Sequence, residues 1–230
     1  MDAVILAGGR GERMAGVTSL YGKPLLQVDG SPLVRRAVEL AISVDVTEPV
    51  VVVSPENASN IHEALEGLPA TLIIQRRPAG PADALRLGLK VHTSSLGCYR
   101  VLVLLSDNVL TYEDVAAVTK HETAVGVSVK PRSEAQRFTW FDPELNDWRE
   151  KVEIPDGDPV ECWVGPFVGL RRNMDRVVRE VSTFSRAAST EALIGPHLGH
   201  MTNGEHTPRI PVSSVDVGTP EAYAKVMGWK

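Results

Sequence analysis

Three glycines occupy four positions directly after the first apolar run of the chain, at Gly8, Gly9 and Gly11. Because glycine has no side chain, the backbone here can approach a ligand closely, and successive N–H groups can face phosphate oxygens. Arg13 adds a positive charge to the same segment. The pattern predicts a phosphate-binding loop. The alternative is a glycine-rich turn that carries surface arginines.

Two common phosphate-binding motifs do not fit this loop. The dinucleotide fingerprint Gly-x-Gly-x-x-Gly requires a third glycine where Met14 stands. A P-loop pattern anchored on Lys23 requires glycine at Val17 and serine or threonine at Pro24. The loop therefore belongs to neither class.

Two aspartates stand at positions where chemistry is expected. Asp107 ends an apolar strand at 101–105, and the carboxyl end of a parallel strand is where such sheets present catalytic groups. Asp216 precedes a predicted helix that begins at Pro220. Each aspartate could instead only cap a turn.

Gln75 follows another predicted strand. Its amide offers a donor and an acceptor, so it can pair with the carbonyl and N–H edge of uracil or thymine. The alternative is an ordinary glutamine at a strand end.

The elements that must position these residues alternate between strand and helix in the first half of the chain. Buried strands are expected at 3–6, 50–53, 71–74 and 101–105. Helices are expected at 31–43, where Ser31 is the N-cap and Pro32 lies in the first turn, at 55–66 and at 81–91. The succession predicts an α/β fold with a mostly parallel sheet flanked by helices, and with ligands outside the carboxyl ends of the strands.

The second half of the chain is richer in strand patterns. Strands separated by turn clusters are expected at 125–129, 138–141, 148–152, 160–170 and 208–212. Helices are expected at 174–181, 189–198 and 220–227. We expect a small antiparallel subsheet built on the same core.

Length and charge narrow the classes of function. At 230 residues with 43% hydrophobic content, the chain is expected to form a single domain over 1–230. The net charge of -5 argues against nucleic acid and anionic membranes as partners. The N-terminal segment lacks a basic region and a long apolar run, so a cytoplasmic location is expected.

Three segments together carry a family resemblance. Leu-Ala-Gly-Gly-x-Gly-x-Arg-Met at 6–14, Lys-Pro-Leu-Leu at 23–26 and Gly-Ser-Pro-Leu at 30–33 resemble the sugar-1-phosphate nucleotidyltransferase family, especially its glucose-1-phosphate thymidylyl- and uridylyltransferase branch. Molybdenum-cofactor guanylyltransferases share the opening but usually place their lysine closer to the arginine. The resemblance implies the Rossmann-like fold of nucleotide-diphospho-sugar transferases.

The same resemblance implies roles for individual residues. Arg13 and Lys23 would act catalytically by neutralising phosphate charge as pyrophosphate departs. Leu-Ser-Asp-Asn at 105–108 and Val-Asp-Val-Gly-Thr at 215–219 resemble the family segments that hold Mg²⁺, here through Asp107 and Asp216. The implied nucleotide-binding residues are Leu6, Ala7, Gly8, Gly9, Gly11, Gln75 and Gly80.

The sugar side of the resemblance departs from the family pattern. Glu150 and Lys151 resemble the family's Glu-Lys-Pro segment without its proline, which implies a hydroxyl acceptor and a phosphate donor. Gly165 stands one position early for the family's Val-x-Gly strand. The family's glycine near Thr139 is absent, and bulkier residues occupy that place.

The expected activity is transfer of a nucleotidyl group from a nucleoside triphosphate, UTP or dTTP, to a sugar 1-phosphate by direct in-line attack. Another phosphorylated acceptor, such as choline, polyol or cofactor phosphate, and a non-catalytic nucleotide-sugar-binding protein remain as alternatives. The sequence leaves the sugar, the choice between UTP and dTTP, and assembly into a homo-oligomer open.

Overall fold

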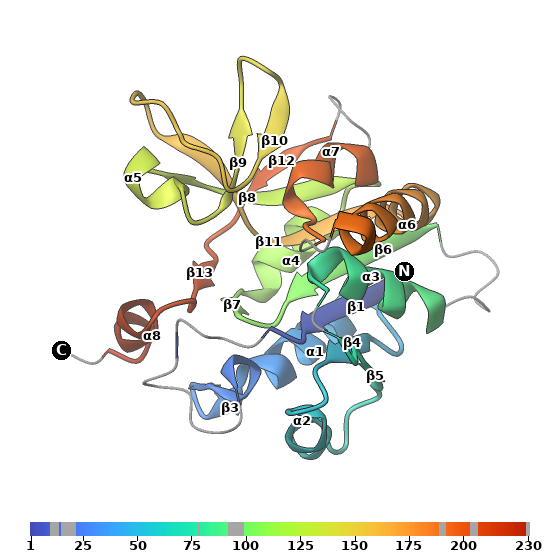
Figure 1. Cartoon of the computed structure of the whole chain (residues 1–230). Coiled ribbons are helices and arrows are strands. Elements are labelled where there is room, and N and C mark those ends of the chain that lie inside the picture. The colour runs from blue at the N-terminus through green and yellow to red at the C-terminus, as the bar shows by residue number, and fades with distance from the viewer. Residues whose placement is uncertain are drawn as a thin grey trace.

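A computed structural model describes residues 1–9, 14, 22–77, 79–91, 99–188, 192–202 and 207–228, with residues 184–188 described by their backbone. Within these residues one nine-stranded mixed sheet forms the centre of the molecule, and two small two-stranded sheets lie beside it (Figure 1). The expected α/β fold, a mostly parallel sheet flanked by helices with smaller antiparallel parts, is confirmed.

Four parallel strands form the part of the sheet that the first half of the chain builds. Their order across the sheet is β5, β4, β1 and β6. They span Asp2–Ala7 (β1), Val50–Val53 (β4), Thr71–Ile74 (β5) and Arg100–Leu105 (β6). The central strands are apolar along almost their whole length because helices cover both faces of the sheet.

Alternate residues of these strands pack on opposite helices. Ile5 packs in one core cluster with α1 (Leu33–Ser43), whereas Val4 packs in the other with α3 (Pro81–Val91). Gly88 of α3 lies so close to β1 that a Cβ atom there would be 2.5 Å from Val4 Cγ1. The helix therefore sits directly against the strand that leads into the glycine loop.

The antiparallel half of the sheet continues from β6. β11 (Val160–Leu170) pairs antiparallel with β6, and β9 (Thr139–Asp142) and β10 (Asp147–Arg149) extend the sheet beyond it. β8 (Ala124–Lys130) pairs with β11, and β12 (Arg209–Pro211) runs parallel to β8. The expected antiparallel extension on the same core is confirmed.

The helices of the second half lie around this extension. α6 (Arg171–Ala188) packs beside α3, and α8 (Pro220–Val226) stands apart near the chain end (Figure 1). Two further helices, which were not expected from the sequence, are α4 (Tyr112–Thr119) and α5 (Arg132–Ala135). In the described part of the chain, no helix combines the length and apolar character needed to cross a membrane.

The start of the first helix differs from expectation. Ser31 and Pro32 form a short strand (β3) that pairs with Gln27–Val28 (β2), and α1 begins at Leu33. The expected N-cap and first-turn roles are therefore wrong. The backbone of these two residues is held in the hairpin, and Leu33 N–H donates to the carbonyl of Leu26.

The second helix is shorter than expected. α2 spans Ala58–Ala64 instead of 55–66. The Asn57 side chain does not cap this helix; it accepts hydrogen bonds from the backbone and hydroxyl of Ser54 and donates to the carbonyl of Ala7. The turn before α2 is thus hydrogen-bonded to the end of β1 through Asn57.

The prediction of a helix at 189–198 is wrong for 192–197, the part that the structure describes before Leu198. Ala192 exchanges backbone hydrogen bonds with the start of α3 and the residues before it, donating to Ala79 and accepting from Ala82. A 3-10 turn, η4 (Gly195–His197), and a short helix, α7 (Leu198–Met201), follow. The strand expected at 148–152 also ends early, at Arg149.

Candidate active site

Two short strands bring the predicted aspartates together. β7 (Asn108–Val109) begins just after Asp107, which follows the end of β6, and β13 (Val215–Asp216) pairs with β7 antiparallel, with Asp216 opposite Asn108. Val217 N–H donates to the carbonyl of Asp107 at 3.1 Å. This ribbon places Asp107 and Asp216 side by side at the carboxyl end of β6, although they are distant in sequence.

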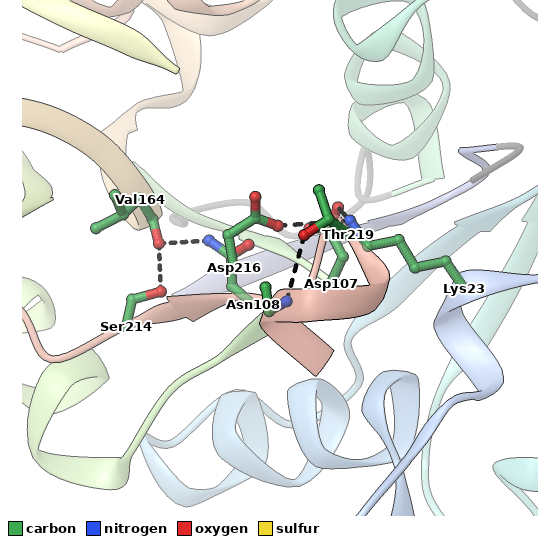
Figure 2. A network of polar contacts seen from close by, with 8 residues as sticks. Lys23, Asp107, Asn108, Val164, Ser214, Asp216 and Thr219 are labelled. Atoms are coloured by element: carbon green, nitrogen blue, oxygen red, sulfur yellow. Dashed lines mark hydrogen bonds and ion pairs between the residues drawn. The ribbon is translucent and has the colours of Figure 1, made fainter. Parts of the chain in front are cut away.

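Lys23 joins both carboxylates (Figure 2). Its Nζ lies 2.6 Å from Asp107 Oδ2 and 3.5 Å from Asp216 Oδ1. The Lys23 side chain is 12% exposed, against 33% for Asp107 and 22% for Asp216. The two carboxylates are thus open to a ligand on one side and held by an ammonium group on the other.

A separate apolar cluster holds the segment that carries Lys23, so that its side chain reaches Asp107 and Asp216. Lys23 begins a 3-10 turn, η2 (Lys23–Leu25), after Gly22, whose φ of 78° favours glycine. The segment that follows packs in the third core cluster, and Tyr223 of α8 donates its hydroxyl to the carbonyl of Gln27 at 2.7 Å. The buried members of this cluster are Met14, Val28, Leu33, Val217 and Tyr223.

The ribbon rests on β11 through the carbonyl of Val164. Asn108 Nδ2 and Ser214 Oγ both donate to this carbonyl, the latter at 2.5 Å (Figure 2). Gly165 lies against the same place, since a Cβ atom there would be 3.2 Å from Leu110 Cδ2 and 3.3 Å from Asn108 Nδ2. The structure thus places Gly165 beside the residue that follows Asp107.

The charge balance of the site affects Asp216. Burial and the neighbouring Asp107 carboxylate raise the pKa of Asp216, and the charges of Lys23 and Arg137 oppose that shift. Arg137 is an exposed residue of the segment between α5 and β9. A further positive charge in this space therefore stabilises the ionised pair.

The donor set suits a hard cation. Carboxylate oxygens are the ligands that Mg²⁺ prefers, and the Lys23 ammonium shows that a positive group fits between these two. Among the described residues no group of three or more His, Cys, Asp or Glu side chains could hold a metal. A metal bound here would use two protein carboxylates and leave its other positions to substrate oxygens and water.

A second group of predicted residues meets at the ends of β1 and β5. Gly8 lies against Gln75, since a Cβ atom on Gly8 would be 3.4 Å from Gln75 Oε1. Gln75 is buried, and its Nε2 donates to the carbonyl of Gly80 and to Asp83 Oδ2, each at 3.2 Å. Gly80 has a φ of 93° and turns the chain into α3.

Asn57 links the two groups. It donates to the carbonyl of Ala7, and a Cβ atom on Gly22 would be 3.7 Å from its Nδ2. Asn57 was not among the site residues expected from the sequence. The signal available was its position four residues after the end of the buried strand β4, on the same side of the sheet where ligands were expected.

The predicted sugar-side residues lie around the ends of β9 and β10. Glu150 Oε2 accepts from Thr139 Oγ1 at 3.0 Å. Gly195 packs on both, since a Cβ atom there would overlap with Thr139 Oγ1 and with Glu150 Oε2. Lys151 follows with an exposed side chain and a φ of 57°. Thr139 and Gly195 had not been predicted as site residues.

The remaining predicted residues belong to the glycine loop. Leu6 and Ala7 end β1, and Gly9 is exposed just beyond it. Gly11 and Arg13 lie outside the described residues. The structure therefore leaves their predicted roles untested.

Comparison with known proteins places the chain among nucleotidyltransferases. The profile of the family described as the MobA-like NTP transferase domain matches residues 3–187. A glucose-1-phosphate thymidylyltransferase of Neisseria gonorrhoeae is 27% identical over 69% of this chain and 58% of its own length. A mannose-1-phosphate guanyltransferase of Debaryomyces hansenii is 29% identical over 75% of this chain and 48% of its own length. The chain spans about half the length of these curated relatives.

The fold is similar to that of solved nucleotidyltransferases. A UDP-glucose pyrophosphorylase complexed with UDP-glucose superimposes with a TM-score of 0.75 at 17% identity, over 99% of this chain and 97% of that one. At this identity the likeness concerns the fold alone.

Proposed function

The chain belongs to the family of MobA-like NTP transferase domains, and from this premise we propose that it transfers a nucleotidyl group from a nucleoside triphosphate to a sugar 1-phosphate. Residues 1–230 act in this proposal as one nucleotidyltransferase domain. The products are a nucleoside diphosphate sugar and pyrophosphate.

The observation that carries this proposal is the meeting of Lys23, Asp107 and Asp216 at the carboxyl end of the sheet. A triphosphate and a sugar phosphate are both anionic, so they approach each other only where positive charge offsets their repulsion. Two carboxylates without other function would only add to that repulsion. Their pairing with an ammonium fits a site that organises cations around phosphates.

Asp107 and Asp216 would hold Mg²⁺, which supplies positive charge to the phosphate oxygens of both substrates when it is bound. Lys23 contributes a compact ammonium with three donors, suited to a phosphate oxygen. We assign Arg13 to the β- and γ-phosphates. Gly8, Gly9 and Gly11 allow the backbone to approach the same chain of phosphates.

The chemical step is a single displacement. A phosphate oxygen of the sugar 1-phosphate attacks the α-phosphorus, and a new P–O bond forms as the bond to the oxygen that bridges to the β-phosphate breaks. Pyrophosphate carries away the electron pair. The residues contribute positioning and charge stabilisation, and the reaction needs no covalent enzyme intermediate.

The sugar binds, in this proposal, near β9 and β10. The carboxylate of Glu150 accepts hydrogen bonds from sugar hydroxyls, and Thr139 holds it in place through the 3.0 Å hydrogen bond. Lys151 donates to the sugar phosphate, and Gly165 lets the backbone of β11 pass close to Asn108, where a side chain would be crowded. The base binds at the opposite group, against Gly8, Gln75 and Gly80, with UTP or dTTP as the expected nucleotide.

A pyrophosphate-release assay tests this function. Each nucleoside triphosphate is combined with a panel of sugar 1-phosphates and with choline and polyol phosphates as alternative acceptors, in the presence of Mg²⁺. We expect release only with UTP or dTTP and a sugar 1-phosphate. If pyrophosphate were released with choline or polyol phosphate but not with any sugar 1-phosphate, the acceptor would not be a sugar 1-phosphate. If no pair of substrates released pyrophosphate, the catalytic proposal would be rejected.

A further inference from the structure

The direction of the Gln75 amide is set by its neighbours. The two groups that its Nε2 contacts at 3.2 Å are the carbonyl of Gly80 and the carboxylate of Asp83, and both can only accept hydrogen bonds. If the amide were reversed, its oxygen would face two other oxygens at that distance. Both amide hydrogens of Gln75 are therefore used inside the protein.

Asp83 is itself held in one position. Its Oδ1 accepts from Nε and Nη2 of Arg86 at 3.1 and 2.8 Å, which leaves Oδ2 directed at Gln75. Asp83 and Arg86 lie in the first turns of α3, and the Asp83 side chain is 8% exposed. The guanidinium pairs with this buried carboxylate, and Asp83 faces Gln75 as a hydrogen-bond acceptor.

The carbonyl end of the Gln75 amide points the other way. Its Oε1 lies next to Gly8, where a Cβ atom would be 3.4 Å away. A base placed against Gly8 thus meets an oxygen acceptor from Gln75. The expectation that Gln75 supplies both a donor and an acceptor to the base does not agree with these contacts.

We propose that Asp83 is a positioning residue that makes Gln75 an acceptor toward the base, so that the site selects bases whose ring nitrogen carries a hydrogen. Such an N–H occurs in uracil, thymine and guanine and is missing from cytosine and adenine. The inference rests on the proposed function, because it assumes that a nucleotide base binds beside Gly8. It adds the chemical reason for the choice of base.

Nucleotide binding without any sugar phosphate tests this inference by calorimetry. The probes are UTP, 3-methyl-UTP, in which a methyl group replaces the N3 hydrogen, and CTP, whose N3 is an acceptor. We expect the wild type to bind UTP about tenfold more tightly than either analogue, because the value of one hydrogen bond at the base is lost. Equal affinity for UTP and CTP would overturn the inference.

The variant Asp83→Asn separates positioning from a structural role. Arg86 would keep the remaining carbonyl oxygen of the substituted side chain, so the new amide group would turn its hydrogens toward Gln75. With only the Gly80 carbonyl left to accept from its Nε2, Gln75 would no longer be held in one direction and would present either end of its amide to the base. We expect the ratio of UTP to CTP affinity to fall about tenfold, with CTP binding gained as UTP binding is lost. Equal weakening of both nucleotides would show a structural role alone and would overturn the inference.

Two further variants complete the test. Gln75→Met removes the acceptor at similar volume, and we expect its preference for UTP over CTP to disappear even if Asp83→Asn does not fold. Lys90→Met changes an exposed residue of the same helix and should leave all affinities unchanged. If UTP binds selectively but no pyrophosphate appears, the proposed function fails and the base selection stands. If pyrophosphate appears equally with UTP and CTP, the function stands and the base selection fails.

Discussion

The ammonium group of Lys23 lies 2.6 Å from Asp107 Oδ2, between the two carboxylates of the candidate site. A divalent cation that binds to Asp107 and Asp216 must compete with it. We predict that Lys23→Met binds Mn²⁺ about tenfold more tightly than the wild type when no nucleotide is present, because the internal positive charge is gone. Calorimetric titration with Mn²⁺ measures this. Lys225→Met, at an exposed position of α8, is the control, and equal Mn²⁺ affinity of wild type and Lys23→Met would contradict the prediction.

The carboxylates themselves are predicted to be essential for turnover. Asp107→Asn and Asp216→Asn should each lower kcat by about two orders of magnitude, since each removes a negative charge that holds a cation at the phosphates. Thermal melts should show that both variants stay folded. The wild type should lose activity in EDTA and recover it with added Mg²⁺, and full activity in EDTA would reject the metal assignment.

Arg13 is predicted to act on the departing pyrophosphate. Arg13→Ala should lower kcat by about two to three orders of magnitude with little change in melting temperature, by analogy with the loss of one preorganised donor. Arg13→Lys should restore little, because an ammonium group cannot reproduce the planar fork of arginine. Steady-state kinetics of both variants beside thermal melts separates this role from that of a surface charge, for which kcat would stay near normal.

Gly195 is predicted to control the position of Glu150. In Gly195→Ala the new methyl group would overlap with Glu150 Oε2 and with Thr139 Oγ1, so at least one of these side chains must move. We expect the KM for the sugar 1-phosphate to rise by about one order of magnitude or more while the KM for the nucleotide changes little. Gly199→Ala is the matched control, because nothing lies within 4 Å of a Cβ atom there. Equal kinetics of the two variants would remove Glu150 from the sugar site.

Asp114 is predicted to stabilise the fold in a pH-dependent way. It forms a capping box with Thr111 at the start of α4 and accepts hydrogen bonds from Ser213. Burial raises the pKa of Asp114, but the hydrogen bonds from Ser213 and Thr111 outweigh this and hold the pKa below its usual 3.8. A lowered pKa in the folded state means that the contribution is complete above pH 3.8 and is lost as the pH falls below it.

Asp114→Asn should therefore lower the free energy of unfolding by about 1 kcal/mol at neutral pH. The difference between wild type and variant should shrink as the pH falls below 3.8. Urea denaturation at several pH values checks both statements. If the difference in free energy of unfolding between wild type and Asp114→Asn did not depend on pH, the negative charge of Asp114 would not contribute to stability.

The sequence predicted most of the strands in the parallel half of the sheet. It also singled out the segment that carries Lys23. Continuous runs such as Val50–Val53 indicate strands buried on both faces, and the structure has this strand at the same residues. The resemblance of Lys-Pro-Leu-Leu at 23–26 to the family is confirmed at the level of the family. Such local patterns can be read without knowledge of the rest of the chain.

The contacts that assemble the site could not be predicted in this way. β7 and β13 contain two residues each, too few to show a period, and their pairing joins distant parts of the chain. The direction of the Gln75 amide depends on Asp83, in the first turn of a helix, and the sequence alone gives no sign of it. Ser31 and Pro32 also have the pattern of a helix start, and only their pairing with Gln27–Val28 prevents it.

The third core cluster has a consequence for recombination between related proteins. Lys23 is carried by a segment that packs on Val217 and Tyr223, and the hydroxyl of Tyr223 donates to the carbonyl of Gln27. The two ends of the described chain thus form one packed unit, although most of the sequence separates them. In a chimera that exchanges residues 1–33 alone, the segment that carries Lys23 would pack against residues from the other parent protein. A chimera that also exchanges residues 213–228 would keep both sides of this contact from the same parent.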